Sequence, residues 1–405
     1  MMLLIMAWRN IWRNKARSMT LISSIALGLF AGVFVLAIYQ GMLKSRIKTV
    51  IRDEISHIQI HHPLFRNDYE AIYTIPQPEK LQVRLQAINE IQQISARSVA
   101  EGMLATGTGS NGVEIRGVNP ANEREVSNLD EKLVEGTYFN TGLKNQLLIG
   151  KKLANKMKLK LNHKVVLTFT DRDNNVISAA FRIKSIYQST NTPLDERIVY
   201  VKRSELNPLL AIGSGAHEMA LLLKNDESLD EVEKRLQKMY PQLSVQSWKE
   251  LSPETEMSIT TVNQFSIIII VIIMLALAFG IVNTMLMAIL ERTRETGMMM
   301  ALGMNKPKVF SVILLETVFL TLAGLPAGLL LAWGLSLYTG SYGINISSFA
   351  EEAMSSFGYA SIIYPEFPFQ YLSDVLLIVI ITALLSSIFP AIKALSMPPV
   401  EALKK

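Results

Sequence analysis

Cysteine is absent from this 405-residue sequence, and charged residues make up only 19% of it. Without cysteine the chain forms no disulfide, no Cys-ligated zinc site, no iron–sulfur cluster and no thiol nucleophile. A soluble domain usually carries about 25% charged residues. Together with the 49% of apolar residues, the low charge favours a membrane protein and excludes a disordered or collagen-like chain.

The net charge of +5 comes from three short segments, 1–18, 291–308 and 393–405, which hold 11 Lys and Arg against three Glu. In contrast, residues 44–260 hold 29 basic and 27 acidic residues, and 338–374 hold four acidic residues and no Lys or Arg. No broad basic surface remains, so nucleic-acid binding is not expected. Basic segments that flank apolar runs instead mark one side of a membrane.

Four apolar runs are long enough to cross a bilayer, which takes roughly 20 residues. We predict transmembrane helices over 18–43, 257–290, 309–337 and 375–392, the second with an extramembrane stalk. The positive-inside rule makes the loop 291–308, the tail 393–405 and the N-terminus cytoplasmic. The acidic loop 338–374 should then be outside, and so should the segment 44–256, because successive spans alternate sides of the membrane.

Residues 1–17 are predicted to form a cytoplasmic elbow helix at the membrane interface. Trp8, Ile11 and Trp12 share one helical face, and Arg9, Arg13 and Arg17 form the neighbouring stripe. Indoles suit the interface and guanidinium groups suit lipid phosphates, so membrane lipid is an expected contact. Simple positive-inside flanking is the alternative and gives the same orientation.

Segment 44–256 is predicted to fold as one large α+β domain. Strand–helix–strand patterns occupy 44–118 and 216–256, which suggests a βαβ-type unit. Between them, 119–215 is rich in strand patterns, including 165–170 and 176–187 around the turn 171–175, and is expected to be a β-rich inserted subdomain. The fold class is thus a membrane protein with four transmembrane α-helices and a large external α+β domain.

Small residues recur at four-residue spacing within the apolar runs and are candidate helix–helix contacts. They are Gly28 and Gly32 in the first run, Ala276 and Gly280 in the second, and Gly324, Gly328 and Ala332 in the third.

Little in the sequence indicates catalysis or a bound cofactor. There is no phosphate-binding loop of the Walker A type, so the chain is not expected to bind ATP itself or to be an enzyme. Asp171, Asp173 and Asn175 begin like a calcium loop, but Val176 occupies the glycine position, which favours a polar hairpin turn. We expect no metal site, and we interpret His57, His61 and His62 as part of a solvated strand edge.

The loop between the second and third runs is the most informative segment. It contains Glu291, Arg292, Arg294 and Glu295, then Gly297, Met298 and, after further apolar residues, Gly303. The charges allow ion pairs one helical turn apart and the methionines form an adaptable apolar surface. We infer a short amphipathic helix that docks on a partner, with an ordinary stop-transfer charge cluster as the alternative. Glu316, within the third run, should face another helix or extend toward the inner surface.

These residues resemble a known family. Glu291-Arg-x-Arg-Glu-x-Gly, Ala301-Leu-Gly303, Glu316 and the ending Pro390…Pro399-Val-Glu-Ala-Leu are similar to the FtsX/MacB/LolC–LolE permeases of ABC transporters (the type VII ABC superfamily). Leu148-Ile-Gly150 with Leu153-Ala resembles the MacB-type periplasmic core, and Gly117-Val-Asn-Pro120 resembles most the lipoprotein-releasing LolC/LolE subgroup. Asn162-His163 departs from the core pattern, which usually has Gly-Asp there, and Thr296 replaces a usual apolar residue.

The resemblance implies a permease of the bacterial inner membrane with a periplasmic 44–256 domain, which works as a homo- or heterodimer with two separate ATPase subunits. ATP and Mg²⁺ would then bind only to those partners. The ATPase subunits would be contacted by the coupling residues Glu291, Arg292, Arg294, Glu295, Gly297, Met298 and Gly303. The cargo would be a lipoprotein, extracted by mechanotransmission and passed to a periplasmic carrier or adaptor. Candidate cleft residues are Phe30, Phe34, Ile38, Phe265 and Ile269.

Two alternatives stay open from the sequence. One is MacB-like efflux of drugs or peptides in a tripartite pump, although MacB proteins carry a fused ATPase. The other is an FtsX-like signalling scaffold that activates cell-wall hydrolases, although the external domain of FtsX is usually smaller.

Overall fold

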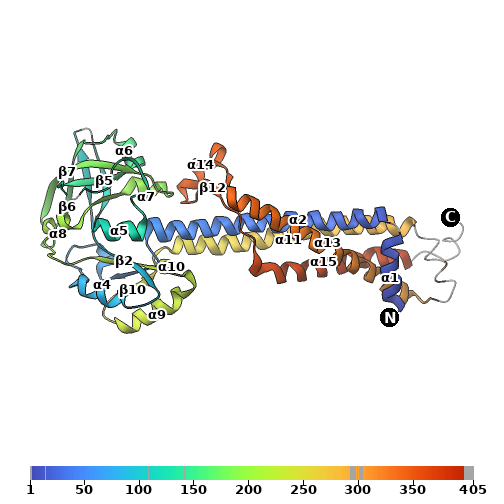
Figure 1. The fold of residues 1–405 in the computed structure, drawn as a ribbon. Coiled ribbons are helices and arrows are strands. Elements are labelled where there is room, and N and C mark those ends of the chain that lie inside the picture. The colour runs from blue at the N-terminus through green and yellow to red at the C-terminus, as the bar shows by residue number, and fades with distance from the viewer. Residues whose placement is uncertain are drawn as a thin grey trace. The chain divides into compact units, whose positions relative to one another are not determined.

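The structure is a computed structural model that describes residues 2–13, 15–107, 109–140, 142–291, 298, 300 and 304–395. The chain divides into two compact units. The first comprises Met1–Leu43, Ile259–Asn345 and Ile362–Lys405, and the second comprises Lys44–Ser258 and Ile346–Ser361. The first is mostly helical and the second contains the large sheet (Figure 1).

The first unit is built from long apolar helices. They are α1 (Met2–Arg13), α2 (Lys15–Thr49), α11 (Pro253–Glu291), α13 (Lys306–Tyr342) and α15 (Leu372–Leu395). Four described helical stretches are long and apolar enough to cross a membrane: Ser18–Glu54, Pro253–Met287, Lys306–Tyr342 and Phe369–Leu395. The four-span prediction is therefore confirmed, and each predicted span lies within one helix.

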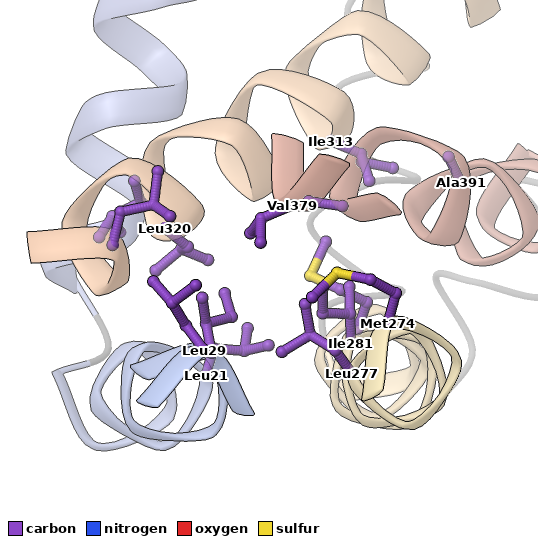
Figure 2. Close-up of a cluster of buried hydrophobic side chains, with 14 of the residues drawn as sticks. Leu21, Leu29, Met274, Leu277, Ile281, Ile313, Leu320, Val379 and Ala391 are labelled. Atoms are coloured by element: carbon purple, nitrogen blue, oxygen red, sulfur yellow. The ribbon is translucent and has the colours of Figure 1, made fainter. Parts of the chain in front are cut away.

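The apolar core of this unit joins α2, α11, α13 and α15. Figure 2 shows Leu21 and Leu29 of α2 pointing toward Leu277 and Ile281 of α11, with Val379 of α15 beside them. Lipid tails are as apolar as these side chains, so van der Waals packing between the helices, rather than removal from water, stabilises this core.

Glycines determine how closely these helices approach. A Cβ atom built on Gly28 would lie 2.6 Å from Cδ1 of Leu277 on α11. On α13, a Cβ on Gly328 would lie 2.7 Å from the Ala26 carbonyl oxygen of α2, and one on Gly324 would lie 3.0 Å from Ile25. The stripes of the first and third runs thus lie at helix contacts. In the second run, a Cβ on Gly280 meets no atom of the described residues within 4 Å.

Helix α1 packs on α13. Ala7 and Ile11 are buried, Trp8 and Trp12 are half exposed, and the rings of Trp8 and Phe319 meet edge to face at 5.7 Å. The three residues that were predicted to share one face of α1 therefore have different surroundings. Ile11 lies in the bundle core, and the indoles of Trp8 and Trp12 lie at its border. An exposed indole beside a buried apolar face suits an interfacial helix.

The second unit contains a ten-stranded sheet with the order β10-β1-β9-β2-β3-β8-β5-β7-β4, in which β6 pairs with β2 and β7. The strands are β1 (Ile58–His61), β2 (Ile91–Thr106), β3 (Gly109–Val118), β4 (Leu133–Gly136), β5 (Gln146–Gly150), β6 (Lys164–Thr170), β7 (Val176–Tyr187), β8 (Ile198–Lys202), β9 (Glu218–Leu223) and β10 (Ser244–Ser247).

The α+β part consists of β10, β1, β9 and the first half of β2, together with α4 (Pro78–Gln86) and α9 (Leu229–Met239). Because β9 is antiparallel to both β1 and β2, these two strands are parallel with one strand between them. This is the split form of the predicted βαβ unit.

Strand β2 belongs to both parts of the sheet. Ile91–Arg97 pairs with β9, and Ser98–Thr106 pairs with β3. Strand β3, which the sequence analysis placed in the α+β part, pairs with β8 in the β-rich part, so that assignment is corrected. The strand pattern of 109–118 indicates a hairpin with the preceding strand, but it gives no sign of the parallel pairing with β8.

Short helices complete the second unit. They are η1, a π-helical turn (Val50–Glu54), α3 (Phe65–Asp68), α5 (Pro120–Ser127), α6 (Lys151–Lys156), α7 (Thr192–Arg197), α8 (Arg203–Leu209), η2 (Asp226–Ser228), α10 (Trp248–Leu251) and α14 (Ser347–Ser356). In the first unit, β11 (Ile344–Asn345) pairs with β12 (Ile362–Ile363), and η3 (Phe369–Tyr371) precedes α15. The segment 346–361, which contains α14, is thus the one part of the loop between α13 and α15 that belongs to the second unit.

Candidate functional site

Most of the predicted coupling residues lie outside the described part of the chain. Helix α11 ends at Glu291, whose backbone alone is described, and Arg292, Arg294, Glu295, Gly297 and Gly303 lie outside the described residues. Met298 is helical and 47% exposed, and Met300 packs against the bundle core. The role of this segment therefore stays a prediction.

The predicted cleft residues lie on two neighbouring helices of the bundle. On α2, the rings of Phe30 and Phe34 stack with their centroids 6.0 Å apart, and Phe30 packs against the bundle core. Ile38 is half-buried. On α11, Phe265 is exposed and Ile269 is half-buried. Exposed aromatic rings on a membrane helix are available to lipid, to cargo or to another chain.

Glu316 lies well inside α13 and is half-buried. The next residue, Thr317, is buried and donates a hydrogen bond to the Ile313 carbonyl at 3.1 Å, and Thr321 repeats this pattern with Thr317. These hydroxyls satisfy themselves within the helix, so they add little polarity to the lipid-facing surface.

A dense polar cluster surrounds the end of α2 in the second unit. The Arg46 guanidinium forms an ion pair with Glu54 and donates a hydrogen bond to Thr255 Oγ1 at 3.0 Å. Asn191 Nδ2 donates to Glu54 Oε1 at 2.7 Å. We call Arg46, Glu54, Asn191 and Thr255 the Arg46 cluster. It joins α2, the π-helical turn, the segment before α7 and the beginning of α11.

The π-helical turn is held on its other side by basic residues of the sheet part. Arg116 Nη1 donates to the Glu54 carbonyl at 3.1 Å, and Lys132 pairs with Asp53 at 2.6 Å. Arg52 donates to the carbonyl of Val126 at the end of α5. Val50 and Ile51 are buried between these contacts. A π-helical turn is a wide, uncommon conformation that frequently marks functional positions.

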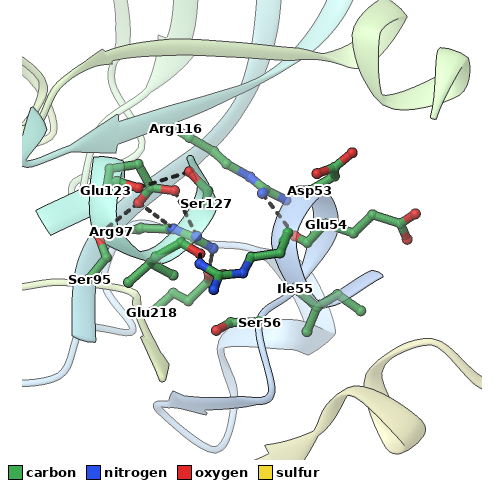
Figure 3. Close-up of polar contacts among 12 residues, drawn as sticks. Asp53, Glu54, Ile55, Ser56, Ser95, Arg97, Arg116, Glu123, Ser127 and Glu218 are labelled. Carbon is green, nitrogen blue, oxygen red and sulfur yellow. Dashed lines mark hydrogen bonds and ion pairs between the residues drawn. The ribbon is translucent and has the colours of Figure 1, made fainter. Parts of the chain in front are cut away.

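Beside this turn, Figure 3 shows a buried group of charges around Arg97. Arg97 forms ion pairs with Glu123 at 2.8 Å and with Glu218 at 2.6 Å, and Ser95 donates to Glu123 at 2.7 Å. Burial opposes ionisation of all three, but Arg97 keeps the pKa of Glu123 and Glu218 below the usual range, and the two carboxylates raise the pKa of Arg97. The group therefore stays charged and fixes the position of α5 on the sheet.

His57 and His61 are not at a solvated strand edge, and for these two residues that interpretation is corrected. Strand β1 lies between β10 and β9, and His57 and His61 are buried. His57 Nδ1 accepts from the Leu223 backbone N–H at 3.1 Å and its Nε2 bonds Asp226 at 2.7 Å. The burial of β1 is not evident from the sequence, because both strands that pair with it, β9 and β10, come from the distant end of the domain.

The segment 171–175 is a polar hairpin turn, as predicted. Asp171 accepts hydrogen bonds from the backbone N–H groups of Asp173 and Asn175, each at 2.8 Å. These bonds and that of the Asn175 amide lower the pKa of Asp171. Its carboxylate oxygens thus serve the turn. No group of three metal-ligating side chains occurs among the described residues.

A polar cleft of about 830 Å³ lies between the β2–β3 hairpin and the 156–164 loop, and Lys156, Lys158 and Lys164 line it. Asn162 at its border has a φ of +66°. This is the left-handed conformation that glycine adopts freely and asparagine tolerates, so Asn162 can replace the glycine of the family pattern without changing the turn.

Sequence reasoning missed the Arg46 cluster and the Arg97 group. Their members are single polar residues on separate elements, such as Arg46 and Thr255, which are 209 positions apart. Two weak signals were present in the sequence. Arg46 is a charged residue just after the first apolar run, and Arg97 is an arginine within a strand pattern.

Comparison with known proteins agrees with this architecture. Residues 18–239 match the MacB-like periplasmic core domain, and residues 267–399 match the FtsX-like permease C-terminal domain. The first match covers more than half of the chain. The chain belongs to the FtsX/MacB/LolC family of ABC transporter permeases, and is a multi-pass membrane protein with a periplasmic domain.

Individual relatives are distant. The chain is 23% identical over 304 residues to the lipoprotein-releasing system transmembrane protein LolC of Buchnera aphidicola, covering 73% of this chain and 72% of that protein. It is 23% identical over 347 residues to the macrolide export ATP-binding/permease protein MacB of Campylobacter jejuni, covering 80% of this chain and 52% of that protein. The periplasmic region of MacB from Actinobacillus actinomycetemcomitans aligns with 53% of this chain at 12% identity and a TM-score of 0.38.

Proposed function

We propose that this permease extracts lipoproteins from the bacterial inner membrane and passes them to a periplasmic carrier, driven by ATP hydrolysis on two separate ATPase subunits. The similarity to LolC supports this, since the alignments cover 72% of the Buchnera protein and 77% of the Neisseria meningitidis protein. In this proposal the chain pairs with a second permease chain, has cytoplasmic termini and binds no cofactor itself.

The observation that carries the proposal is the length and anchoring of α2 and α11. They contain 35 and 39 residues, which is about 52 and 58 Å of helix against a bilayer core of about 30 Å. Their extramembrane ends both bond within the Arg46 cluster, through Arg46 and Thr255. A continuous helix moves as one rigid body, so a displacement at one end also moves the hydrogen-bonded far end. A flexible loop between the two ends would absorb that displacement.

Extraction of a lipoprotein needs such work, because transfer of acyl chains to water costs about 0.8 kcal/mol per CH₂ group. In this mechanism the 291–303 segment contacts the ATPase, closure of the ATPases moves the inner ends of the helices, and α2 and α11 convey the motion to the periplasmic domain. The aromatic residues Phe30, Phe34 and Phe265, with Ile38 and Ile269, would shield the acyl chains.

A second candidate function is MacB-like efflux of drugs or peptides, which the alignment over 80% of this chain to a macrolide exporter supports. The two functions place different molecules in the same membrane cleft, a triacylated protein or a smaller amphiphile. An FtsX-like signalling scaffold that activates cell-wall hydrolases is a third possibility within the family, and it would show ATPase coupling without any cargo.

The test is to purify the chain with its ATPase and reconstitute the complex in proteoliposomes that contain a triacylated lipoprotein. We expect ATP-dependent release of the lipoprotein into solution when a carrier is added, and none with a non-hydrolysable ATP analogue. ATP hydrolysis that a macrolide stimulates and a lipoprotein does not would support efflux instead. Hydrolysis that neither cargo changes would contradict both transport functions.

A further inference from the structure

The Arg46 cluster includes one more chain segment, the 346–361 part of the loop between α13 and α15. Gly358 is buried against it. A Cβ atom built on Gly358 would lie 2.8 Å from Arg46 Nη1 and 3.2 Å from Asn191 Nδ2. Gly358 also has a φ of +72°, which disfavours any other residue. This segment therefore reaches the guanidinium by close backbone approach.

The cluster thus contains residues that are connected along the chain to all four transmembrane helices. Arg46 lies on α2, Thr255 lies at the beginning of α11, and Gly358 lies in the segment that links α13 to α15. Glu54 and Asn191 connect it to the π-helical turn and to the segment before α7. Tyr359, the residue after Gly358, interacts electrostatically with Arg46, and burial raises the pKa of its hydroxyl, so it stays neutral.

The residues of the cluster are suited to holding several segments at once. The side chains of Arg46 and Glu54 are each only 10% exposed. A guanidinium is planar, always charged and has five N–H donors, so it can bond a carboxylate and a hydroxyl together, and a lysine ammonium does not reproduce that fork. In a partly buried site such charge-assisted bonds are about twice as strong as neutral ones.

We propose that Arg46 is the positioning residue of the transport cycle, through which movement of the four membrane helices reaches the periplasmic domain as one motion. This inference rests on the proposed function, since it assigns a residue to the coupling of ATP hydrolysis to cargo release. In this role Arg46 acts through Glu54, Thr255 and the Gly358 backbone.

The first experiment compares Arg46→Gln and Arg46→Lys in the complete complex in lipoprotein-loaded proteoliposomes. For Arg46→Gln we expect the lipoprotein released per ATP hydrolysed to fall about tenfold or more, the effect of losing a charge-assisted hydrogen bond. ATP hydrolysis should stay within about twofold, because the ATPase contacts are elsewhere. Arg46→Lys should retain part of the coupling, because it keeps the charge but not the fork.

The matched control is Arg235→Gln, which removes an arginine from the Arg235–Glu90 ion pair on α9, far from the cluster in sequence. It should leave both the release and the hydrolysis unchanged. A merely structural role for Arg46 would lower the melting temperature and both rates together, and that result would overturn the proposal. Unchanged release per ATP in Arg46→Gln would overturn it as well.

A second variant covers the case in which Arg46→Gln does not fold. Gly358→Ala places a methyl group against the guanidinium. Gly213→Ala carries similar backbone strain, at a φ of +58°, but its Cβ has no atom of the described residues within 4 Å. We expect Gly358→Ala to lower release per ATP and Gly213→Ala to leave it unchanged. Equal behaviour of the two variants would contradict the inference.

A third measurement separates the inference from the proposed function. The chain lacks cysteine, so Ser356→Cys can carry a single nitroxide on α14 of the full complex. We expect the motion of the label to be restricted in the parent complex. Arg46→Gln should make the label more mobile, and Arg235→Gln should leave its mobility unchanged. If no lipoprotein is released by the unmodified complex, the proposed function fails while this result still decides the anchoring. Equal label motion in all three would refute the anchoring.

Discussion

Buried ionic groups show most clearly what individual residues contribute. Arg97 and its two carboxylates are almost completely buried, whereas Arg197 and Glu101 form a pair in which both side chains are more than half exposed. The exposed pair contributes little to stability because solvent screens it. Removal of one member of the buried group costs about 3–5 kcal/mol, since an unpaired charge stays behind in the interior.

Two buried histidines make the periplasmic domain sensitive to acid. Burial lowers the pKa of His61 and of His217 to about 4, from 6.5 in an unfolded chain. His217 Nδ1 accepts from the Val99 N–H at 2.9 Å and its Nε2 donates to the Ala71 carbonyl. Protonation of Nδ1 would remove that acceptor, so the folded state disfavours the cation.

The unfolded chain binds these protons below pH 6.5 and the folded chain does so only near pH 4. Stability is therefore full above pH 6.5 and is lost as the pH falls toward 4. We expect a loss of about 2 kcal/mol for each ring between pH 7.5 and pH 5, measured by urea denaturation of the full chain in detergent with proteolysis as the readout of domain unfolding.

Variants assign this loss to the buried rings. His217→Gln should be less stable than the parent at pH 7.5 but should lose less on acidification. The control His163→Gln, at an exposed position, should follow the parent profile. A parent chain that is equally stable at pH 5 and pH 7.5 would show that these rings titrate normally.

The sequence identifies residues well where local pattern determines their surroundings. The Asp171–Asn175 turn follows from its spacing, because Asp171 bonds N–H groups only two and four residues away. His61 was misjudged because the strands on both sides of it, β9 and β10, come from the other end of the domain. Burial in a sheet depends on such distant pairing, which a single strand pattern does not encode.

At the scale of the elements, glycine position controls the packing of the membrane helices. Gly328 faces the α2 backbone, while Gly334 on the same helix has no atom of the described residues within 4 Å of a built Cβ. A leucine at position 328 would have to push α2 and α13 apart, whereas a leucine at position 334 would extend into open space.

We therefore expect Gly328→Leu to destabilise the helix bundle by about 1–3 kcal/mol or more, the usual cost of overpacking. Gly334→Leu, the matched control in α13, should stay close to the parent. The measurement is the thermal unfolding of the full chain in detergent, followed by intrinsic fluorescence. Similar unfolding temperatures for both variants would argue against the α2–α13 contact.

The helices were more predictable than the sheet. An apolar run of about 20 residues has few structures available in a bilayer, so 18–43 and 309–337 were located from composition alone. The pairing of β3 could not be predicted in this way, since its parallel partner β8 begins 80 residues after β3 ends. The π-helical turn after α2 also leaves no periodic signal, because its five residues continue a helical pattern.

For the whole molecule, the proposed transport requires that the 291–303 segment, between α11 and α13, receives force from the ATPase. Glu291→Lys with Glu295→Lys reverses two charges four positions apart in this segment. We expect the double variant to insert normally but to lose ATP-dependent release of lipoprotein, by about tenfold or more if two ion pairs with the ATPase are replaced by repulsion.

The matched control is Glu227→Lys with Glu231→Lys, which reverses two exposed glutamates at the same spacing next to α9. It should keep release at the parent level. Full release by the Glu291→Lys, Glu295→Lys variant would show that this segment is not the coupling element.

The central claim is that the chain connects two sides of a membrane, with the sheet-bearing unit on one side and the 291–303 segment on the other. Because the sequence has no cysteine, Arg172→Cys and Arg294→Cys each introduce a single thiol. In intact spheroplasts, a membrane-impermeant maleimide should label Arg172→Cys at once and Arg294→Cys only after lysis. Labelling of both thiols in intact spheroplasts, or of neither until lysis, would put the two segments on one side and would contradict the account.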